Sequence, residues 1–302
     1  MTKPPLKPPD GRQGPGPMPQ RLVDALDLVV ATRAGGALPG DKRAVGVGVG
    51  TELAQLRPYE VGDDVRQIDP AATARTGEPH VRLHVPERTL TTWIALDVSP
   101  SMAFGTAERL KSDVAEGATL LMARLAIRRA GRVSLVRFGA GDIQLMRPRA
   151  SRPGIVAVSR ALGEGVAADG NSDARALGHA LLRVGKVARQ AGLVVVIADF
   201  RDQDDWTRPL GALRARHSVL ALEVRDPREG ELPAVGHLSL VDPETGELIE
   251  VDTARRSLRR RFEQIEAERR ARVAAELRRL RVEHVVLSTG ENWLRALGRR
   301  LH

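Results

Sequence analysis

Asp97, Ser99 and Ser101 form the pattern Asp-x-Ser-x-Ser directly after an apolar segment, residues 93–96. A carboxylate beside two hydroxyls offers only oxygen donors, and these suit a hard cation such as Mg²⁺ or Mn²⁺ rather than zinc or copper. The chain has no cysteine, which excludes thiolate-bound metals and a thiolate nucleophile. The pattern therefore predicts a site for a hard cation.

Two further segments carry oxygen donors in a similar setting. Asp199 ends the apolar run 193–198, and Ser172 opens a predicted helix after a glycine-containing loop. In an open parallel sheet, side chains that follow the carboxyl ends of the strands converge on one crevice. We therefore expect one metal site, with a coordination position left for a visiting ligand. Its expected ligands are Asp97, Ser99, Ser101, Ser172 and Asp199.

Each of these residues alone has a simpler interpretation. Serine and aspartate are common helix caps and turn formers. Ser172 and Asp173 lie where an N-cap is expected, and Asp199 is compatible with a plain strand end. Only their joint placement at three strand ends of one sheet favours the metal site.

The elements that must position these residues follow from the alternation of apolar runs with amphipathic stretches after residue 91. This alternation is typical of a parallel sheet covered by helices on both faces. Residues 142–147 are expected to pair with the second strand as an antiparallel edge. The fold class is therefore α/β, a doubly wound and mostly parallel sheet of Rossmann type. The predicted strands are 93–97, 133–138, 193–199, 219–224 and 284–288, and the predicted helices are 108–130, 173–190, 206–216, 253–280 and 291–301.

Three regions are expected along the chain. Residues 1–19 are rich in proline and predict a disordered leader. Residues 20–88 predict a smaller block packed on the sheet, with a helix at 20–33 and a glycine-rich loop at 35–50, and residues 89–302 form the α/β domain. No apolar run approaches the ~20 residues of a membrane span, and the start lacks a secretory signal. We therefore expect a cytoplasmic protein without a membrane span.

The net charge of +9 raises the question of nucleic-acid binding. Residues 251–302 carry 14 arginines and 7 acidic residues, so +7 of the +9 lies there, largely on the predicted helix 253–280. Such a run is commonly a solvated helix face, and no nucleic-acid motif accompanies it. Nucleic-acid binding stays an alternative that would use Arg255, Arg256, Arg259, Arg260 and Arg261. The apolar residues of this helix predict a stripe packed on the core: Leu258, Phe262, Ile265, Val273, Leu277 and Leu280.

Charged residues of both signs crowd the segment 52–75, which has few apolar residues. Such a mixture favours a salt-bridged platform near the sheet edge over a catalytic site. Partner recognition is the open alternative, and its candidate residues are Arg57, Tyr59, Asp63, Asp64, Arg66, Asp69 and Arg75.

Two sets of residues carry a family resemblance. The stretch from Gly50 to Asp69, followed by Ala74-Arg75 and Val81-Arg82, resembles the hallmark block of the bacterial domain of unknown function 58 (DUF58) family, with Pro70 where that family usually has tryptophan. The Asp-x-Ser-x-Ser pattern, Gly170-Asn-Ser172-Asp and Ile197-Ala-Asp199-Phe are similar to the metal-ion-dependent adhesion site of von Willebrand factor A-like domains, with serine in place of the usual threonine at position 172.

This resemblance implies a non-enzymatic module that binds a protein partner through Mg²⁺ or Mn²⁺. The partner it implies is a MoxR-type AAA+ ATPase, with which the protein would act in chaperone-like maturation or assembly of protein complexes.

A metal-dependent phosphatase with Asp97 as nucleophile is the alternative for the same crevice. A site like that of the haloacid dehalogenases has a second acid two residues after the nucleophile, where Ser99 stands. No lysine lies in the sequence near the end of the third predicted strand, and the histidines form no metal-ligand pair. The loop from Gly46 to Gly50 lacks the ending of a phosphate-binding loop. We therefore expect no catalytic residues.

Overall fold

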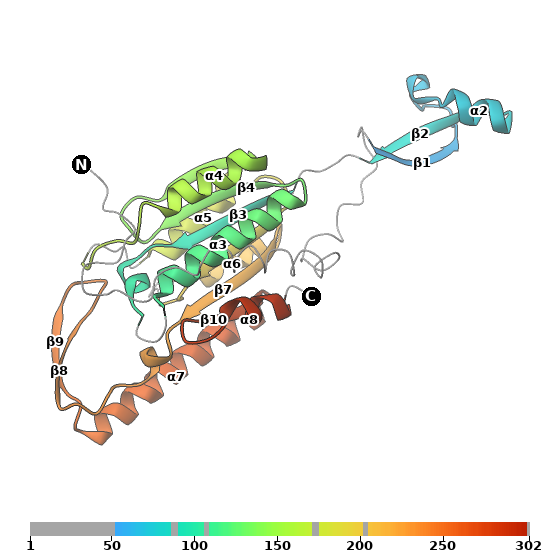
Figure 1. Ribbon diagram of the computed structural model, residues 1–302. Coiled ribbons are helices and arrows are strands. Elements are labelled where there is room, and N and C mark those ends of the chain that lie inside the picture. The colour runs from blue at the N-terminus through green and yellow to red at the C-terminus, as the bar shows by residue number, and fades with distance from the viewer. Residues whose placement is uncertain (1–51, 86–89, 106–108, 171–174, 202–204, 301–302) are drawn as a thin grey trace. The chain divides into compact units, whose positions relative to one another are not determined.

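The computed structural model describes residues 52–85, 90–105, 109–170, 175–201 and 205–300 (Figure 1). The predicted leader at 1–19, the helix at 20–33, the loop at 35–50, and Ser172 and Asp173 lie outside these residues. The described residues divide into two compact units, one of residues 52–85 and one that begins at Leu90.

The larger unit is built on a six-stranded sheet in the order β10-β7-β6-β3-β4-β5. The strands are parallel except for β5, which pairs antiparallel with β4 at one edge. The α/β fold class with a mostly parallel sheet is thus confirmed, including the antiparallel edge. The strands are β3 (Thr91–Asp97), β4 (Arg132–Phe138), β5 (Gln144–Ala150), β6 (Leu193–Ala198), β7 (Ser218–Arg225) and β10 (Glu283–Ser288).

Helices cover both faces of this sheet (Figure 1). On β3, Ile94 and Leu96 face one core, whereas Trp93 and Ala95 face the other, so the strand is apolar on both sides. The first core is closed by α3 (Lys111–Arg128), α4 (Ser151–Leu162) and α8 (Trp293–Arg300), and the second by α5 (Ala176–Val187), α6 (Thr207–Arg214) and α7 (Arg256–Arg279). In the described part of the chain, no helix combines the length and the apolarity needed to cross a membrane.

Three features of this unit differ from the sequence expectation. Helix α4 was not predicted, nor was the antiparallel hairpin of β8 (His237–Val241) and β9 (Leu248–Asp252). The apolar stripe predicted on α7 is core packing only in part, because Val273 and Leu277 are buried whereas Ile265 is 49% exposed. The N-terminal half of α7 therefore extends beyond the sheet face that its C-terminal half covers.

The smaller unit consists of a β-hairpin-like pair with a helical connection. Strand β1 (Glu52–Pro58) pairs antiparallel with β2 (His80–Val85), and the connection holds a 3-10 turn, η2 (Val65–Gln67), and α2 (Pro70–Thr76). Asp69 caps α2 through the backbone N–H of Ala72, and Pro70 takes the first helical position, where its missing N–H is no loss. Packing of this unit on the sheet edge stays a prediction.

Candidate metal centre at the carboxyl edge of the sheet

The candidate site lies where the chain direction changes within the sheet. Strands β3 and β6 are parallel neighbours, while the chain leaves β3 for β4 on the opposite side. A crevice forms at such a switch point, beyond the carboxyl ends of the two strands. Asp97 is the last residue of β3 and Asp199 directly follows β6. Strand order therefore brings the two carboxylates to one place.

The loop after β3 brings its polar groups together at this edge of the sheet. The Ser99 backbone N–H donates to Asp97 Oδ1 over 2.9 Å, and the Ser99 and Ser101 hydroxyls are 3.0 Å apart. Ser101 Oγ also donates to Asp199 Oδ2 over 2.9 Å. All four residues are buried. The structure thus gathers the four predicted ligands that it describes, and their role as metal ligands stays a prediction.

Gly139, which follows β4, makes this close arrangement feasible. Its φ is +92°, and a Cβ at this position would lie 2.7 Å from the Ser99 nitrogen and 2.9 Å from Asp97 Oδ1. Any side chain would therefore push against the loop that carries the site. Sequence analysis missed this residue, although a glycine directly after a buried strand is a signal of close backbone approach.

Lys111, at the start of α3, reaches the site and was missed by sequence analysis. Its ammonium lies 2.7 Å from Asp199 Oδ2 and 2.6 Å from Glu229 Oε1, and the side chain is 0% exposed. The expectation that no lysine lies near the end of the third strand is therefore wrong in space, because α3 packs beside β6 although 88 positions separate Lys111 from Asp199. The sequence did contain one signal of this contact, because Lys111 lies near the start of a predicted helix, ten positions after Ser101.

The buried charges at this point hold each other in the ionised state. Burial alone would lower the pKa of Lys111, but Asp199 and Glu229 outweigh it, and the pKa of Lys111 is raised. Burial alone would raise the pKa of Asp199, whereas Lys111 and Arg201 keep it well below its usual range. Asp199 is therefore an ionised carboxylate that already has a cationic partner on Oδ2.

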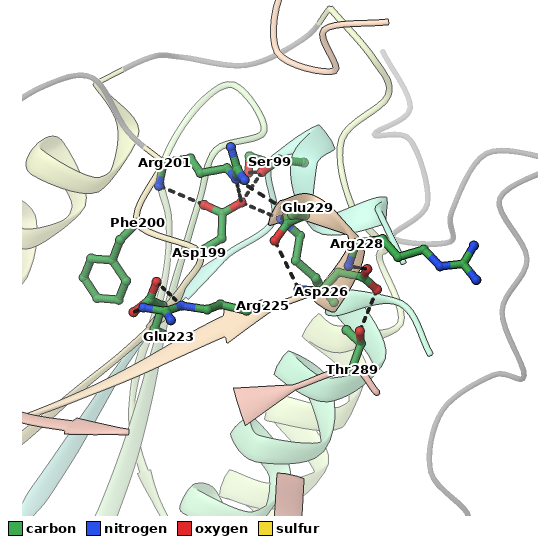
Figure 2. A network of polar contacts seen from close by, with 12 residues as sticks. Ser99, Asp199, Phe200, Arg201, Glu223, Arg225, Asp226, Arg228, Glu229 and Thr289 are labelled. Atoms are coloured by element: carbon green, nitrogen blue, oxygen red, sulfur yellow. Dashed lines mark hydrogen bonds and ion pairs between the residues drawn. The ribbon is translucent and has the colours of Figure 1, made fainter. Parts of the chain in front are cut away.

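Glu229 enters the site from the turn after β7 (Figure 2). Arg201 links Glu229 to Glu266 of α7. Arg201 Nε lies 3.4 Å from Glu229 Oε1, and its terminal nitrogens each donate over 3.0 Å to Glu266. Glu229 belongs to a capping box that begins at Asp226, in the turn η4 (Pro227–Gly230). The Asp-x-x-Glu spacing is a sequence signal for such a turn, but it does not reveal the contact with Lys111.

A second polar cluster on β7 and β10 is structural. Glu223 is buried and accepts two hydrogen bonds of 2.6 Å from Arg225 (Figure 2). It also accepts one of 2.8 Å from His284. Burial alone would raise the pKa of Glu223, but these hydrogen bonds lower it. The carboxylate is thus satisfied by neighbours within the sheet.

The donor set fits a hard cation that is held partly by hydroxyls. Among the described residues, no three histidine, aspartate or glutamate side chains form a metal-binding cluster. Two carboxylates and two serine hydroxyls do meet at the carboxyl edge, and oxygen-only donors are what Mg²⁺ takes. The residues present therefore suit Mg²⁺ or Mn²⁺, which Asp97, Ser99, Ser101 and Asp199 would hold. Asp199 also pairs with Lys111.

In the smaller unit, several of the candidate partner-binding residues are engaged within the unit. Arg57 forms an ion pair with Asp63 at 2.7 Å, and the Asp64 side chain caps η2. Asp69 accepts a hydrogen bond of 2.7 Å from Arg82 Nε. These contacts agree with a salt-bridged platform. Arg66 and Arg75 are exposed and Tyr59 is half-buried. Partner recognition by these residues stays a prediction.

Comparison with known proteins identifies relatives of uncharacterised function. A family model described as "Protein of unknown function DUF58" matches residues 55–272. An uncharacterized protein of Mycobacterium tuberculosis is 36% identical over 277 residues, which cover 89% of this chain and 84% of that protein.

Solved structures offer a weaker likeness. The conserved hypothetical protein BatB from Bacteroides thetaiotaomicron covers 70% of this chain and 97% of its own, with 16% identity and a TM-score of 0.42. A von Willebrand factor type A structure from Catenulispora acidiphila covers 47% of this chain and 35% of its own, with 17% identity and a TM-score of 0.36. Both TM-scores are too low to carry a functional inference.

Proposed function

Since this chain belongs to the DUF58 family, we propose that it is a non-enzymatic protein-binding module that holds Mg²⁺ or Mn²⁺ at the carboxyl edge of its sheet. The observation that carries the proposal is the meeting of Asp97, Ser99, Ser101 and Asp199 within one buried hydrogen-bonded group. Ser172 is the fifth proposed ligand. The ion supplies an electrophilic position that an incoming carboxylate completes.

The chain's own residues have distinct roles in this proposal. Asp97 contributes a negative charge and fixes the loop through the Ser99 N–H, and the two hydroxyls add neutral donors. Lys111 and Arg201 orient Asp199 and offset its charge. Affinity for a partner depends on the ion, while specificity depends on the surface around the crevice.

The proposed partner is a MoxR-type AAA+ ATPase in the cytoplasm, with a role in chaperone-like maturation or assembly of protein complexes. The support for this partner is the resemblance of the block Gly50 to Asp69 to the DUF58 hallmark sequence. The candidate contact residues on the smaller unit are Arg57, Tyr59, Asp63, Asp64, Arg66, Asp69 and Arg75.

A phosphatase in the same crevice has one observation in its favour, the lysine at Asp199. The geometry weighs against it, because the Lys111 side chain is 0% exposed and its ammonium already bridges two carboxylates. The Lys111 ammonium is therefore not accessible to a substrate phosphate. In addition, a phosphatase of the haloacid-dehalogenase kind has a second acidic residue two positions after its nucleophile, and this chain has Ser99 there. A general acid or base for turnover is therefore not supported.

Calorimetric titration with Mg²⁺ and Mn²⁺ tests the metal site. Asp97→Ala is expected to abolish binding because it removes a charge that offsets dehydration of the cation, whereas Ser99→Ala removes a neutral donor and weakens binding less. Asp142→Ala, at an exposed carboxylate after β4, is the control and retains full affinity. Unchanged affinity in Asp97→Ala refutes the site.

Pull-downs from lysate test how the partner is held. Arms with EDTA and with high salt separate contact through the ion from contact through the arginines of α7, since arginine contacts with phosphates fade as salt rises. We expect loss of the partner in EDTA and in Asp97→Ala. Retention in EDTA with loss in high salt supports nucleic-acid or acidic-surface binding through Arg255, Arg256, Arg259, Arg260 and Arg261 instead.

A further inference from the structure

The β8–β9 hairpin brings an additional carboxylate to the candidate site. Its turn reaches the side of the sheet at which the strands end (Figure 1). Glu244 lies in this turn, and its Oε1 accepts a hydrogen bond of 3.2 Å from the Ser101 backbone N–H. The contact joins residues 143 positions apart. A glutamate from a distant hairpin thus lies on the loop that carries the site serines.

The turn holds Glu244 in place before any ligand arrives. Asp242 Oδ1 accepts a hydrogen bond of 2.9 Å from the Glu244 backbone N–H. The Asp242 N–H donates to the Glu247 carbonyl over 2.8 Å, and the Asp242 carbonyl accepts from the Gly246 N–H over 2.7 Å. The Gly170 N–H donates over 2.9 Å to Pro243 O, which ties the turn to a second loop of the carboxyl edge. Because these bonds already order the turn, little conformational entropy is lost when Glu244 binds a cation.

The second oxygen of Glu244 is buried without compensation. Oε2 is inaccessible to solvent and, within the described ranges of the chain, accepts no hydrogen bond, and Glu244 forms no ion pair there. By contrast, Asp199 and Glu229 are matched by Lys111 and Arg201. An unsatisfied buried carboxylate oxygen is costly, and a cation beside it removes that cost.

We propose that Glu244 is a ligand of the cation, supplied by the chain itself, and that it takes in cis the coordination position that a partner's carboxylate takes in the complex. This inference rests on the proposed function, because it requires a cation at Asp97, Ser99 and Ser101. The hairpin then closes the site in the free protein, and a partner must displace Glu244 to bind.

Titration with Mn²⁺ of the full chain and matched variants tests the proposal. Glu244→Gln is expected to weaken Mn²⁺ binding about tenfold, or about 1.4 kcal/mol. Glu247→Gln removes the same charge from an exposed position of the same hairpin and leaves the affinity unchanged. Glu244→Asp keeps the charge but withdraws the carboxylate by one methylene, so direct ligation predicts weaker binding there too.

Hydrogen exchange gives a readout independent of affinity. Mn²⁺ is expected to slow amide exchange across residues 237–252 in the wild type and in Glu247→Gln, but not in Glu244→Gln, because the cation holds the turn only through this carboxylate. Tryptophan fluorescence verifies that each variant is folded.

The outcomes separate this inference from the proposed function. If Asp97→Ala loses Mn²⁺ while all three hairpin variants bind as the wild type does, Glu244 is only a structural latch, and the inference is overturned while the metal site stands. If the wild type binds no Mn²⁺, both are overturned.

Discussion

Replacement of Lys111 by methionine tests the buried charge pairing at the site. Lys111→Met keeps the apolar stem but removes an ammonium that lies 2.7 Å from Asp199 Oδ2 and 2.6 Å from Glu229 Oε1. Both carboxylates remain, with side chains only 4% and 8% exposed. Loss of one partner from a buried ion pair costs about 3–5 kcal/mol because a charge is left uncompensated. Arg201 stays within 4.0 Å of Asp199 and compensates part of its charge. We therefore expect the free energy of unfolding to fall by about 3 kcal/mol, the lower end of that range.

The pH dependence follows from the direction of the pKa shifts. The folded pKa of Asp199 is lowered, so its contribution to stability is present above the unfolded pKa of 3.8 and is lost as the pH falls. The folded pKa of Lys111 is raised, so its contribution is present below the unfolded pKa of 10.5 and is lost as the pH rises beyond it. The difference between wild type and Lys111→Met is therefore largest near neutral pH and narrows below about pH 4.

Urea unfolding followed by tryptophan fluorescence measures this difference. Trp93, Trp206 and Trp293 are all buried in the unit that contains the site. Lys186→Met, at an exposed position of α5, is the control and is expected to change the free energy of unfolding by less than about 0.5 kcal/mol. A loss in Lys111→Met no larger than that of the control would refute the buried pairing.

Three further variants probe the packing, the site loop and a half-buried carboxyl group. In Gly117→Ala the new Cβ would lie 2.6 Å from the buried ring of Trp293, so urea unfolding should show a loss of about 1–3 kcal/mol despite the better helix propensity of alanine, and a gain contradicts the packing. Gly139→Ala is expected to lose Mn²⁺ affinity in titration, whereas Gly141→Ala, also at positive φ but with no atom within 4 Å, retains it; equal loss in both contradicts the close approach. Burial and a nearby carboxylate raise the pKa of Glu116 from 4.5 to about 7, so stability falls as the pH rises between these values. The free energy of unfolding of Glu116→Gln should then exceed that of the wild type by about 1–3 kcal/mol at pH 8 and by little at pH 4. An equal difference at both pH values argues against the raised pKa of Glu116.

The sequence by itself determined the strands of the main sheet and five of the helices that cover it, but not α4. A strand that is buried on both faces, such as residues 193–198, consists of consecutive apolar residues. This local pattern was sufficient to predict β3, β4, β6, β7 and β10. The Asp-x-Ser-x-Ser pattern at a strand end was likewise local. Exposed elements carry a weaker pattern, and for that reason the β8–β9 hairpin was missed.

Only the tertiary structure decided which side chains meet at the site. Lys111, Glu229 and Glu244 contact the site from a helix start, a 3-10 turn and a hairpin turn, across separations of 88 to 143 positions. Periodicity tells which face of an element is buried, but not which element lies beside it. That neighbourhood depends on the order β7-β6-β3-β4 and on how α3 and the hairpin cross the carboxyl edge, which are outcomes of packing over the whole unit.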